Sequence, residues 1–227
     1  MTPDCPLPRF GVRPFATVNG VALYRSRAID GIEATELCAL TQLGITAIYD
    51  LRKPAERHPG EVLLASSLAI HVLEDDLQDD EQRTNLTRSC NIVASYGLPG
   101  QRMEHMYTTI AQHGAALRSI IDAALATTAP LLIHCVNGKD RAGVVCACIQ
   151  RALGVPMPEI YRDYLKTNVL NADMNRRDLA RLASTLSTKE LAVMAALFEA
   201  RPAYLDAFWQ AIDARYGSFE RFTQASF

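Results

Sequence analysis

Cys135 and Arg141, six residues apart, are the residues of this sequence best suited to carry out chemistry. They flank a polar junction between one apolar run, "LLIHC", and a second, "RAGVVCACIQRAL". This pattern predicts a buried strand that ends at Cys135, a short loop, and a helix that begins near Arg141. Backbone N–H groups at the start of such a helix form an anion site, and the helix dipole stabilises a thiolate beside it. The spacing therefore predicts a nucleophilic thiolate that faces a bound anion.

A phosphoryl group is the anion that best fits this junction. The amides of residues 136–140 can curl around it, and the planar fork of Arg141 can bind two of its oxygens, which a lysine cannot match. In-line attack by Cys135 would give a phosphocysteine, with the transition-state charge stabilised by the amides and Arg141. The leaving oxygen needs a proton from an Asp or Glu, which later activates the hydrolytic water. The residues thus predict phosphomonoester hydrolysis without a metal or cofactor.

The same residues resemble the signature of a known family. H-C-x5-R marks the cysteine-dependent protein tyrosine phosphatase superfamily, and "HCVNGKDRAG" is similar to the H-C-x-x-G-K-D-R-x-G variant of its atypical tyrosine and lipid phosphatases, a group that includes the mycobacterial phosphatase B. Four more segments resemble motifs of that group in the same order: "LYRSRAI" (23–29), "DLRKPAE" (50–56), "DYLKTN" (163–168) and "YGSFERF" (216–222). The resemblance implies a substrate that is a phosphotyrosine, phosphoserine or phosphothreonine protein, a phosphoinositide or an inositol phosphate.

The resemblance also implies roles for individual residues. Cys135 is the expected nucleophile and Arg141 the phosphate clamp. Asp140 occupies a position regarded as either a catalytic acid or a loop-organising acceptor, and the sequence leaves both alternatives open. Lys139 matches the lysine of the group, where a second cation suits a substrate with several phosphates. The other residues expected to bind phosphate are Val136, Asn137, Gly138 and Ala142.

A different general acid could come from the acidic segment "EDDLQDD" (74–80). Its candidates are Asp75, Asp76, Asp79 and Asp80, among which the position after a predicted strand favours Asp76. The irregular stretch 75–100 that starts here is long enough to indicate a lid or binding loop, with a solvated variable loop as the alternative.

Ala142 departs from the usual pattern of the superfamily, in which a Ser or Thr follows the arginine and stabilises the departing thiolate. Its absence predicts slower phosphocysteine hydrolysis, by one hydrogen bond to a charged group or about 1.5–3 kcal/mol. On this ground a phosphate-binding protein without turnover stays an alternative function. Sulfur or arsenate chemistry of the rhodanese type is a further alternative, which the G-K-D-R pattern disfavours.

Several residues near these motifs are expected to be structural. Arg52 and Glu56 predict a salt bridge or helix cap beneath the loop, in preference to substrate contact. His134 is expected to be a neutral imidazole bonded to the loop backbone. Cys146 and Cys148 fit the core of the helix that follows the loop.

Hydrophobic patterning predicts the elements that must position the site. Asn19-Gly20 predicts a hairpin between two strands within 14–26, and "EATELCALTQL" predicts a helix that stops at Gly44. Strands alternating with helices predict an α/β fold with a mostly parallel central sheet flanked by helices, the αβα core of tyrosine phosphatases, and a helical C-terminal part. The other strands are expected at 45–51, 69–74 and 129–135, and the other helices at 102–127 with a break near Gly114, 141–153, 158–169, 173–185, 188–200 and 203–215.

Length and composition set the remaining bounds. The 227 residues, 49% of them hydrophobic, are expected to form one phosphatase domain with a core at about 14–155 and a helical part at about 157–222. Basic and acidic residues nearly balance, 23 against 25, which argues against a nucleic-acid partner. No apolar run is long enough to span a bilayer, and the first residues lack a secretory layout, so a cytoplasmic location is expected. The lack of a C-x-x-C motif or paired histidines predicts no metal site.

Overall fold

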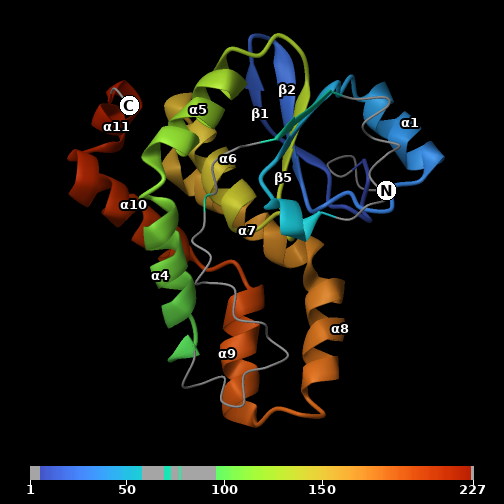
Figure 1. Ribbon diagram of the computed structural model, residues 1–227, viewed down its shortest axis with the longest axis vertical. Coiled ribbons are helices and arrows are strands. Elements are labelled where there is room, and N and C mark those ends of the chain that lie inside the picture. Colours follow the sequence, from blue (N-terminus) through green and yellow to red (C-terminus); the bar gives the residue numbers. More distant parts are fainter. Residues whose placement is uncertain (1–5, 58–68, 73–76, 78–95, 226–227) are drawn as a thin grey trace. The chain divides into compact units, whose positions relative to one another are not determined.

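The computed structural model describes residues 6–57, 69–72, 77 and 96–225 (Figure 1). The chain forms two compact units: Met1–Leu77 with Ala115–Tyr164, and Gln78–Gly114 with Leu165–Phe227. The first unit contains the sheet and the loop after Cys135. The four candidate acids of the "EDDLQDD" segment and most of the stretch predicted as a lid lie outside the described residues.

The sheet of the first unit has five strands among the described residues, in the order β1-β2-β5-β3-β4. β1 and β2 form an antiparallel hairpin, and β2, β5, β3 and β4 run parallel to one another. The hairpin turns at Asn19 and Gly20, whose φ angles of 50° and 80° are those that a tight primed turn requires. The strands are β1 (Arg13–Val18), β2 (Val21–Ser26), β3 (Ala47–Asp50), β4 (Ala69–Val72) and β5 (Leu131–His134). The predicted mostly parallel sheet is confirmed.

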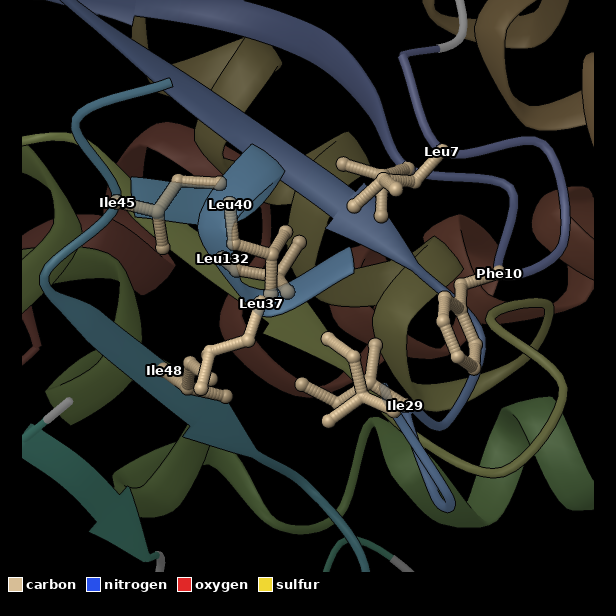
Figure 2. Packing of buried hydrophobic residues seen from close by; sticks show 10 residues of the cluster. Leu7, Phe10, Ile29, Leu37, Leu40, Ile45, Ile48 and Leu132 are labelled. Carbon is tan, nitrogen blue, oxygen red and sulfur yellow. The ribbon is translucent and has the colours of Figure 1, made fainter. Parts of the chain in front are cut away.

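Helices cover both faces of this sheet, as parallel strands require. On one face, Leu37 and Leu40 of α1 (Ala34–Gln42) share a buried cluster with Ile48 of β3 and Leu132 of β5 (Figure 2). The other face is covered by α5 (Gly114–Leu125) and α6 (Arg141–Ala152) (Figure 1). All four residues of β5 are buried. The strand that leads to Cys135 is therefore closed on both sides, and the predicted αβα core is confirmed.

The strand register brings three loops together at one edge of the sheet. Ser26 at the end of β2 and Asp50 at the end of β3 both pair with His134 at the end of β5. Because the carboxyl ends of parallel strands meet at the same edge, the segments that follow these strands lie around Cys135.

Helix α6 follows the loop and is buried from Arg141 to Gln150. Its cysteines, Cys146 and Cys148, are fully buried, as predicted for core residues. Burial raises the pKa of the Cys146 thiol to about 12 and also raises that of Cys148, so neither is a nucleophile at neutral pH. Helix α7 (Met157–Leu170) comes next, and its residues 157–164 belong to the first unit.

The second unit is helical in its described part. Helices α4 and α10 pack together, with the rings of Tyr107 and Tyr204 5.8 Å apart. Trp209 of α10 meets Phe219 edge to face at 5.5 Å. Apolar positions of α10 are buried, as expected for one face of an amphipathic helix. The helices are α4 (Gln101–Ile110), α8 (Ala172–Leu182), α9 (Thr188–Phe198), α10 (Pro202–Tyr216) and α11 (Phe219–Gln224), the last not predicted as a helix. No helix in the described part of the chain is long and apolar enough to cross a membrane.

Candidate active site

Residues 135–140, called the phosphate loop below, connect β5 to α6. Cys135 directly follows β5 and is 2% exposed. Asp140 is the N-cap residue of α6, yet its side chain makes no capping hydrogen bond to the helix. The first-turn N–H groups of α6 are therefore not capped by this carboxylate and can face an anion. Val136 is exposed, whereas Gly138, Lys139 and Ala142 are buried.

Gly138 allows the loop to pass close to the end of β2. Its φ of 63° is left-handed, and a Cβ atom here would lie 2.4 Å from the carbonyl oxygen of Ser26. No side chain fits at that distance, so only glycine is compatible with the position. On the same side, the N–H of Ala28 donates to the carbonyl of Val136 at 2.9 Å. The last residue of β2 and the segment that follows it thus pack against the phosphate loop.

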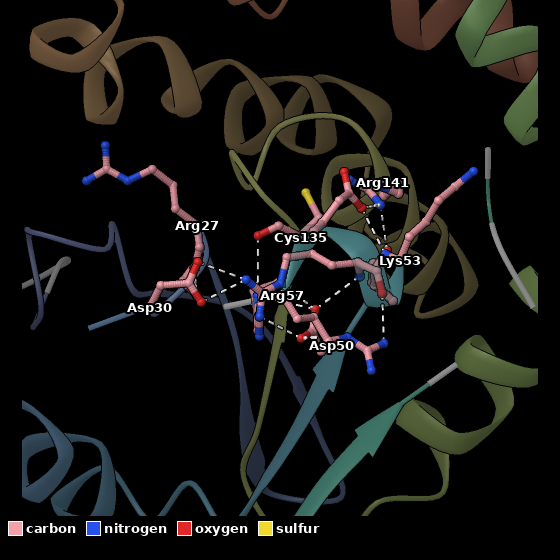
Figure 3. Close-up of polar contacts among 12 residues, drawn as sticks. Arg27, Asp30, Asp50, Lys53, Arg57, Cys135 and Arg141 are labelled. Atoms are coloured by element: carbon pink, nitrogen blue, oxygen red, sulfur yellow. Dashed lines mark hydrogen bonds and ion pairs between the residues drawn. The ribbon is translucent and has the colours of Figure 1, made fainter. Parts of the chain in front are cut away.

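Arg141 is held by acceptors that leave one edge of its guanidinium available. Nη1 donates to the Leu51 carbonyl at 2.9 Å and to Oε2 of Glu56 at 2.7 Å, and Nη2 donates to Oε1 of Glu56 at 3.0 Å (Figure 3). A guanidinium has five N–H donors, and these bonds use three. The Nε hydrogen and one Nη2 hydrogen meet no acceptor among the described residues. They form the edge that can bind two phosphate oxygens.

The charge of Arg141 is secured by its surroundings. Burial works to lower the pKa of this guanidinium, but the hydrogen bonds to Glu56 and the nearby charges of Cys135 and Glu56 outweigh it and raise the pKa. The clamp is therefore a cation at neutral pH.

Glu56 reaches Arg141 from a single helical turn, η1 (Pro54–Glu56), which follows β3. Oε2 of Glu56 also accepts from the backbone N–H of Lys53 at 2.8 Å, closing a capping box around the turn. The sequence offered a salt bridge or a helix cap as alternatives, and Glu56 makes both. The sequence did not indicate that its partner would be Arg141.

Arg52 forms a separate ion pair that holds the segment after β3. Its Nε and Nη2 donate to the two oxygens of Asp50 at 2.9 and 2.8 Å, and its Nη1 donates to Asp30 at 2.8 Å. Burial alone would raise the pKa of Asp50, but the hydrogen bonds from Arg52 and the neighbouring positive charge hold it below its usual value. This pair fixes the backbone that presents the Leu51 carbonyl to Arg141.

His134 is a structural neighbour of the nucleophile. Its Nδ1 lies 3.3 Å from the Cys135 carbonyl and 3.8 Å from Oδ1 of Asp50. Complete burial lowers the pKa of the imidazole, the Asp50 charge opposing this only in part. The predicted neutral imidazole bonded to the loop backbone agrees with this geometry.

Lys139 and Asp140 lie side by side in the phosphate loop. Lys139 is 1% exposed, and its Nζ is 3.4 Å from Oδ1 of Asp140, whose side chain keeps 20% of its surface exposed. The lysine therefore places its charge inside the protein, next to the loop carboxylate, and not on the outer rim of the site.

Two residues near the loop were missed by sequence reasoning. Arg25 and Asp163 are both buried, and Arg25 donates to the carbonyls of the loop. They lie within two of the segments that resemble family motifs, "LYRSRAI" and "DYLKTN". The sequence could have indicated them, because each is a charged residue on an otherwise apolar face of a strand or helix, a pattern that predicts a buried ion pair.

Comparison with known proteins places the chain in a class. It matches the model of a tyrosine phosphatase family over residues 12–227 and belongs to that family. It is 32% identical over 206 residues to a protein named as a tyrosine-protein phosphatase in Cupriavidus necator, covering 88% of this chain and 72% of the relative. It is 29% identical over 229 residues to the triple specificity protein phosphatase PtpB of Mycobacterium tuberculosis, covering 86% and 82%. The resemblance read from the five motifs is confirmed.

A solved structure was also matched. The crystal structure of P. aeruginosa TpbA gives a TM-score of 0.45 at 14% identity, over 83% of this chain and 92% of that chain.

Proposed function

We propose that the protein hydrolyses phosphomonoesters through a phosphocysteine formed on Cys135. One observation carries this proposal: Cys135 at the end of β5 faces the charge of Arg141 at the start of α6, and the Nε and Nη2 edge of that guanidinium matches two oxygens of a phosphoryl group. Phosphotyrosine in proteins is the first substrate class, and phosphoserine, phosphothreonine and phosphoinositides or inositol phosphates are further candidates. The names of the two relatives support a protein phosphatase.

The proposed reaction has two displacements at phosphorus. The Cys135 thiolate attacks, the bond to the leaving oxygen breaks, and that oxygen takes a proton from a carboxylic acid. The same carboxylate then removes a proton from water, which attacks the phosphocysteine and releases inorganic phosphate and the thiolate. Loop amides and Arg141 stabilise the equatorial oxygens in both steps.

Asp140 is the general acid that we favour. Asp140 belongs to the phosphate loop itself and keeps 20% of its side-chain surface exposed, with Nζ of Lys139 3.4 Å from its Oδ1. Glu56 and Asp50, by contrast, each form a bidentate pair with a buried arginine, Arg141 and Arg52. Asp76 stays the alternative acid from the segment outside the described residues. The buried position of Lys139 next to Asp140 supports a role for this lysine inside the loop and not at a second phosphate.

We further propose that the whole chain acts as one phosphatase domain and that it works in the cytoplasm. The described cysteines, including Cys135, are free thiols, and free thiols are the usual state of cysteine in a reducing compartment, which supports this location.

Turnover of p-nitrophenyl phosphate in EDTA tests the reaction class. Wild type should hydrolyse the ester and Cys135→Ser should not, while Cys38→Ser, an exposed thiol on α1, serves as the matched control with full activity. Wild-type protein that binds orthovanadate without turning over any ester would instead establish a phosphate-binding module.

A substrate panel tests the finer assignments. Phosphotyrosine, phosphoserine and phosphothreonine peptides and inositol phosphates would be compared on wild type, Lys139→Ala and Asp140→Ala. If Asp140 is the acid, its variant loses most activity on esters with poor leaving groups and much less on p-nitrophenyl phosphate, whose leaving group needs little protonation. An equal loss on both would remove Asp140 from that role. If Lys139→Ala loses activity selectively on polyphosphorylated substrates, Lys139 binds a second phosphate of the substrate.

A further inference from the structure

Arg25 is a fully buried cation directly behind the phosphate loop. It sits in β2 with none of its surface exposed. Its Nε and Nη2 donate to the carbonyl oxygen of Gly138 at 2.9 and 2.8 Å, and its Nη2 also lies 3.3 Å from the carbonyl oxygen of Lys139. Two successive carbonyls of the loop are thus fixed by one guanidinium.

These bonds set the direction of the loop amides. In a trans peptide the C=O and the following N–H point in opposite directions, and no cis peptide is present among the described residues. With the Gly138 carbonyl turned toward Arg25, the N–H of Lys139 must point away from it. The Lys139 carbonyl likewise directs the N–H of Asp140 away from the core.

Asp163 holds Arg25 in this orientation. Its Oδ2 accepts from Nη1 of Arg25 at 3.1 Å, and its Oδ1 accepts from Nε of Arg13 in β1 at 3.3 Å. All three side chains are buried, and one carboxylate lies between the two guanidiniums. Burial, followed by the charge of Arg25, lowers the pKa of Arg13 to about 10, so both arginines are cations at neutral pH.

Space for Arg25 is provided at the start of α6. A Cβ atom on Gly143 would lie 3.0 Å from Nη2 of Arg25 and 3.2 Å from the ring of Tyr164. The glycine two residues after Arg141 therefore leaves room for the guanidinium to pass beneath the helix and reach the loop.

We propose that Arg25 is a positioning residue for the phosphate loop, which turns the N–H groups of Lys139 and Asp140 toward the bound phosphoryl group and is itself fixed by Asp163. This inference rests on the proposed function, because it assigns the direction of those amides to the same phosphoryl site. Arg25 does not touch the substrate; it acts through the two carbonyls that it holds.

The test compares Arg25→Lys with Arg13→Lys. Each variant keeps the charge and loses a guanidinium bond to the Asp163 carboxylate, but Arg13 lies one strand further from β5 and the loop. The measurements are the inhibition constant of orthovanadate, kcat/KM for p-nitrophenyl phosphate, and Tm. Arg25→Lys should weaken vanadate binding and kcat/KM together by about tenfold to a hundredfold, the effect of losing charge-assisted hydrogen bonds. Arg13→Lys should keep both within about threefold at a comparable loss of Tm.

Equal vanadate affinity in the two lysine variants, whatever their Tm, would overturn the inference. If wild type neither hydrolyses esters nor binds vanadate, the proposed function falls and the inference falls with it. A wild-type enzyme whose Arg25→Lys variant behaves like Arg13→Lys would overturn the inference alone.

A measurement on wild type covers the case in which Arg25→Lys does not fold. Backbone amide resonances of Lys139 and Asp140 should shift when inorganic phosphate is added, because both N–H groups become donors to the anion. Asp163→Asn, which keeps the shape of the side chain, should reduce these shifts. Amides that do not respond to phosphate in wild type would refute the proposed orientation.

Discussion

Glu56 and Arg141 are joined by two parallel hydrogen bonds of 2.7 and 3.0 Å between residues 85 positions apart in the chain. The guanidinium is therefore oriented before any substrate arrives. Its conformational entropy is lost on folding and not on binding, which favours tight binding of a phosphoryl group.

Glu56→Gln should weaken the hold on the Arg141 guanidinium while retaining the shape of the side chain. One acceptor oxygen becomes an amide that faces the guanidinium, so Arg141 loses a charge-assisted bond and kcat/KM for p-nitrophenyl phosphate should fall about tenfold to a hundredfold. Glu36→Gln is the matched control, because Glu36 also closes a capping box and pairs with an arginine, Arg9, but on α1. Equal activities of the two variants would show that the Glu56 carboxylate does not prepare the clamp.

Gly138→Ala should remove activity by displacing the phosphate loop. The new Cβ atom would fall 2.4 Å from the Ser26 carbonyl oxygen, in addition to the strain of a left-handed backbone, so the backbone must move. Gly154→Ala separates the two effects, since Gly154 has φ of 75° and nothing within 4 Å of an added Cβ. The control should lose about 1 kcal/mol of unfolding free energy and keep its kcat/KM. Undiminished turnover in Gly138→Ala would contradict the described loop.

The buried His134 should make the protein less stable in mild acid. The unfolded imidazole takes up a proton near pH 6.5, whereas burial lowers the pKa of the folded one. Below about pH 6.5 the unfolded state binds more protons than the folded state. The neutral His134 therefore contributes its full stabilisation of the fold above this pH, and the free energy of unfolding decreases as the pH falls toward the pKa of the folded imidazole. Urea unfolding between about pH 7.5 and about pH 5.5 should show this slope in wild type, and His134→Gln should flatten it.

The exposed His105 on α4 provides the control for this titration. His105→Gln should leave the slope unchanged. A slope that persists in His134→Gln would assign the acid sensitivity to other groups. Asp50, whose pKa is also lowered, adds a second loss of stability only at more acidic pH, below its unfolded value of 3.8.

Ala142→Ser should speed the second displacement. Ala142 is fully buried in the first turn of α6, and a hydroxyl there can donate to the thiolate that leaves the phosphocysteine. If this step limits turnover, kcat should rise about tenfold or more and the initial burst of p-nitrophenol should shrink. Ala147→Ser, a buried hydroxyl further along α6, controls for the effect on stability. An unchanged kcat and a persistent burst in Ala142→Ser would show that the lack of a hydroxyl at this position does not slow phosphocysteine hydrolysis.

Features that depend on neighbouring residues were predictable from the sequence. Asn19-Gly20 defined the hairpin, Gly44 ended α1, and the helix break near Gly114 separates α4 from α5. Local backbone preference and hydrophobic period decide such features, and the apolar run before Cys135 indicated its strand in the same way. The last helix, α11, was missed because its six residues are too short for a helical period to be recognised.

Features that depend on partner choice were not predictable. Arg52 and Glu56 stand four residues apart, a spacing that suggests a pair, yet they bond to Asp50 and to Arg141 respectively. The choice is made by the strand order, which places β5 beside β3 and so brings Arg141 within reach of η1. A single sequence does not reveal that strand order, and it equally gave no sign that Arg25 would pair with Asp163.

The bonds from Arg25 to the phosphate loop connect residues 113 and 114 positions apart, and the bond from Arg25 to Asp163 spans 138. Such pairings require the chain to close long loops, which only the folded first unit does. The signature segment "HCVNGKDRAG" therefore contains the reacting groups but not the information that shapes them. A peptide cut from it would have a thiol of ordinary reactivity, and catalytic competence would emerge only with the complete first unit.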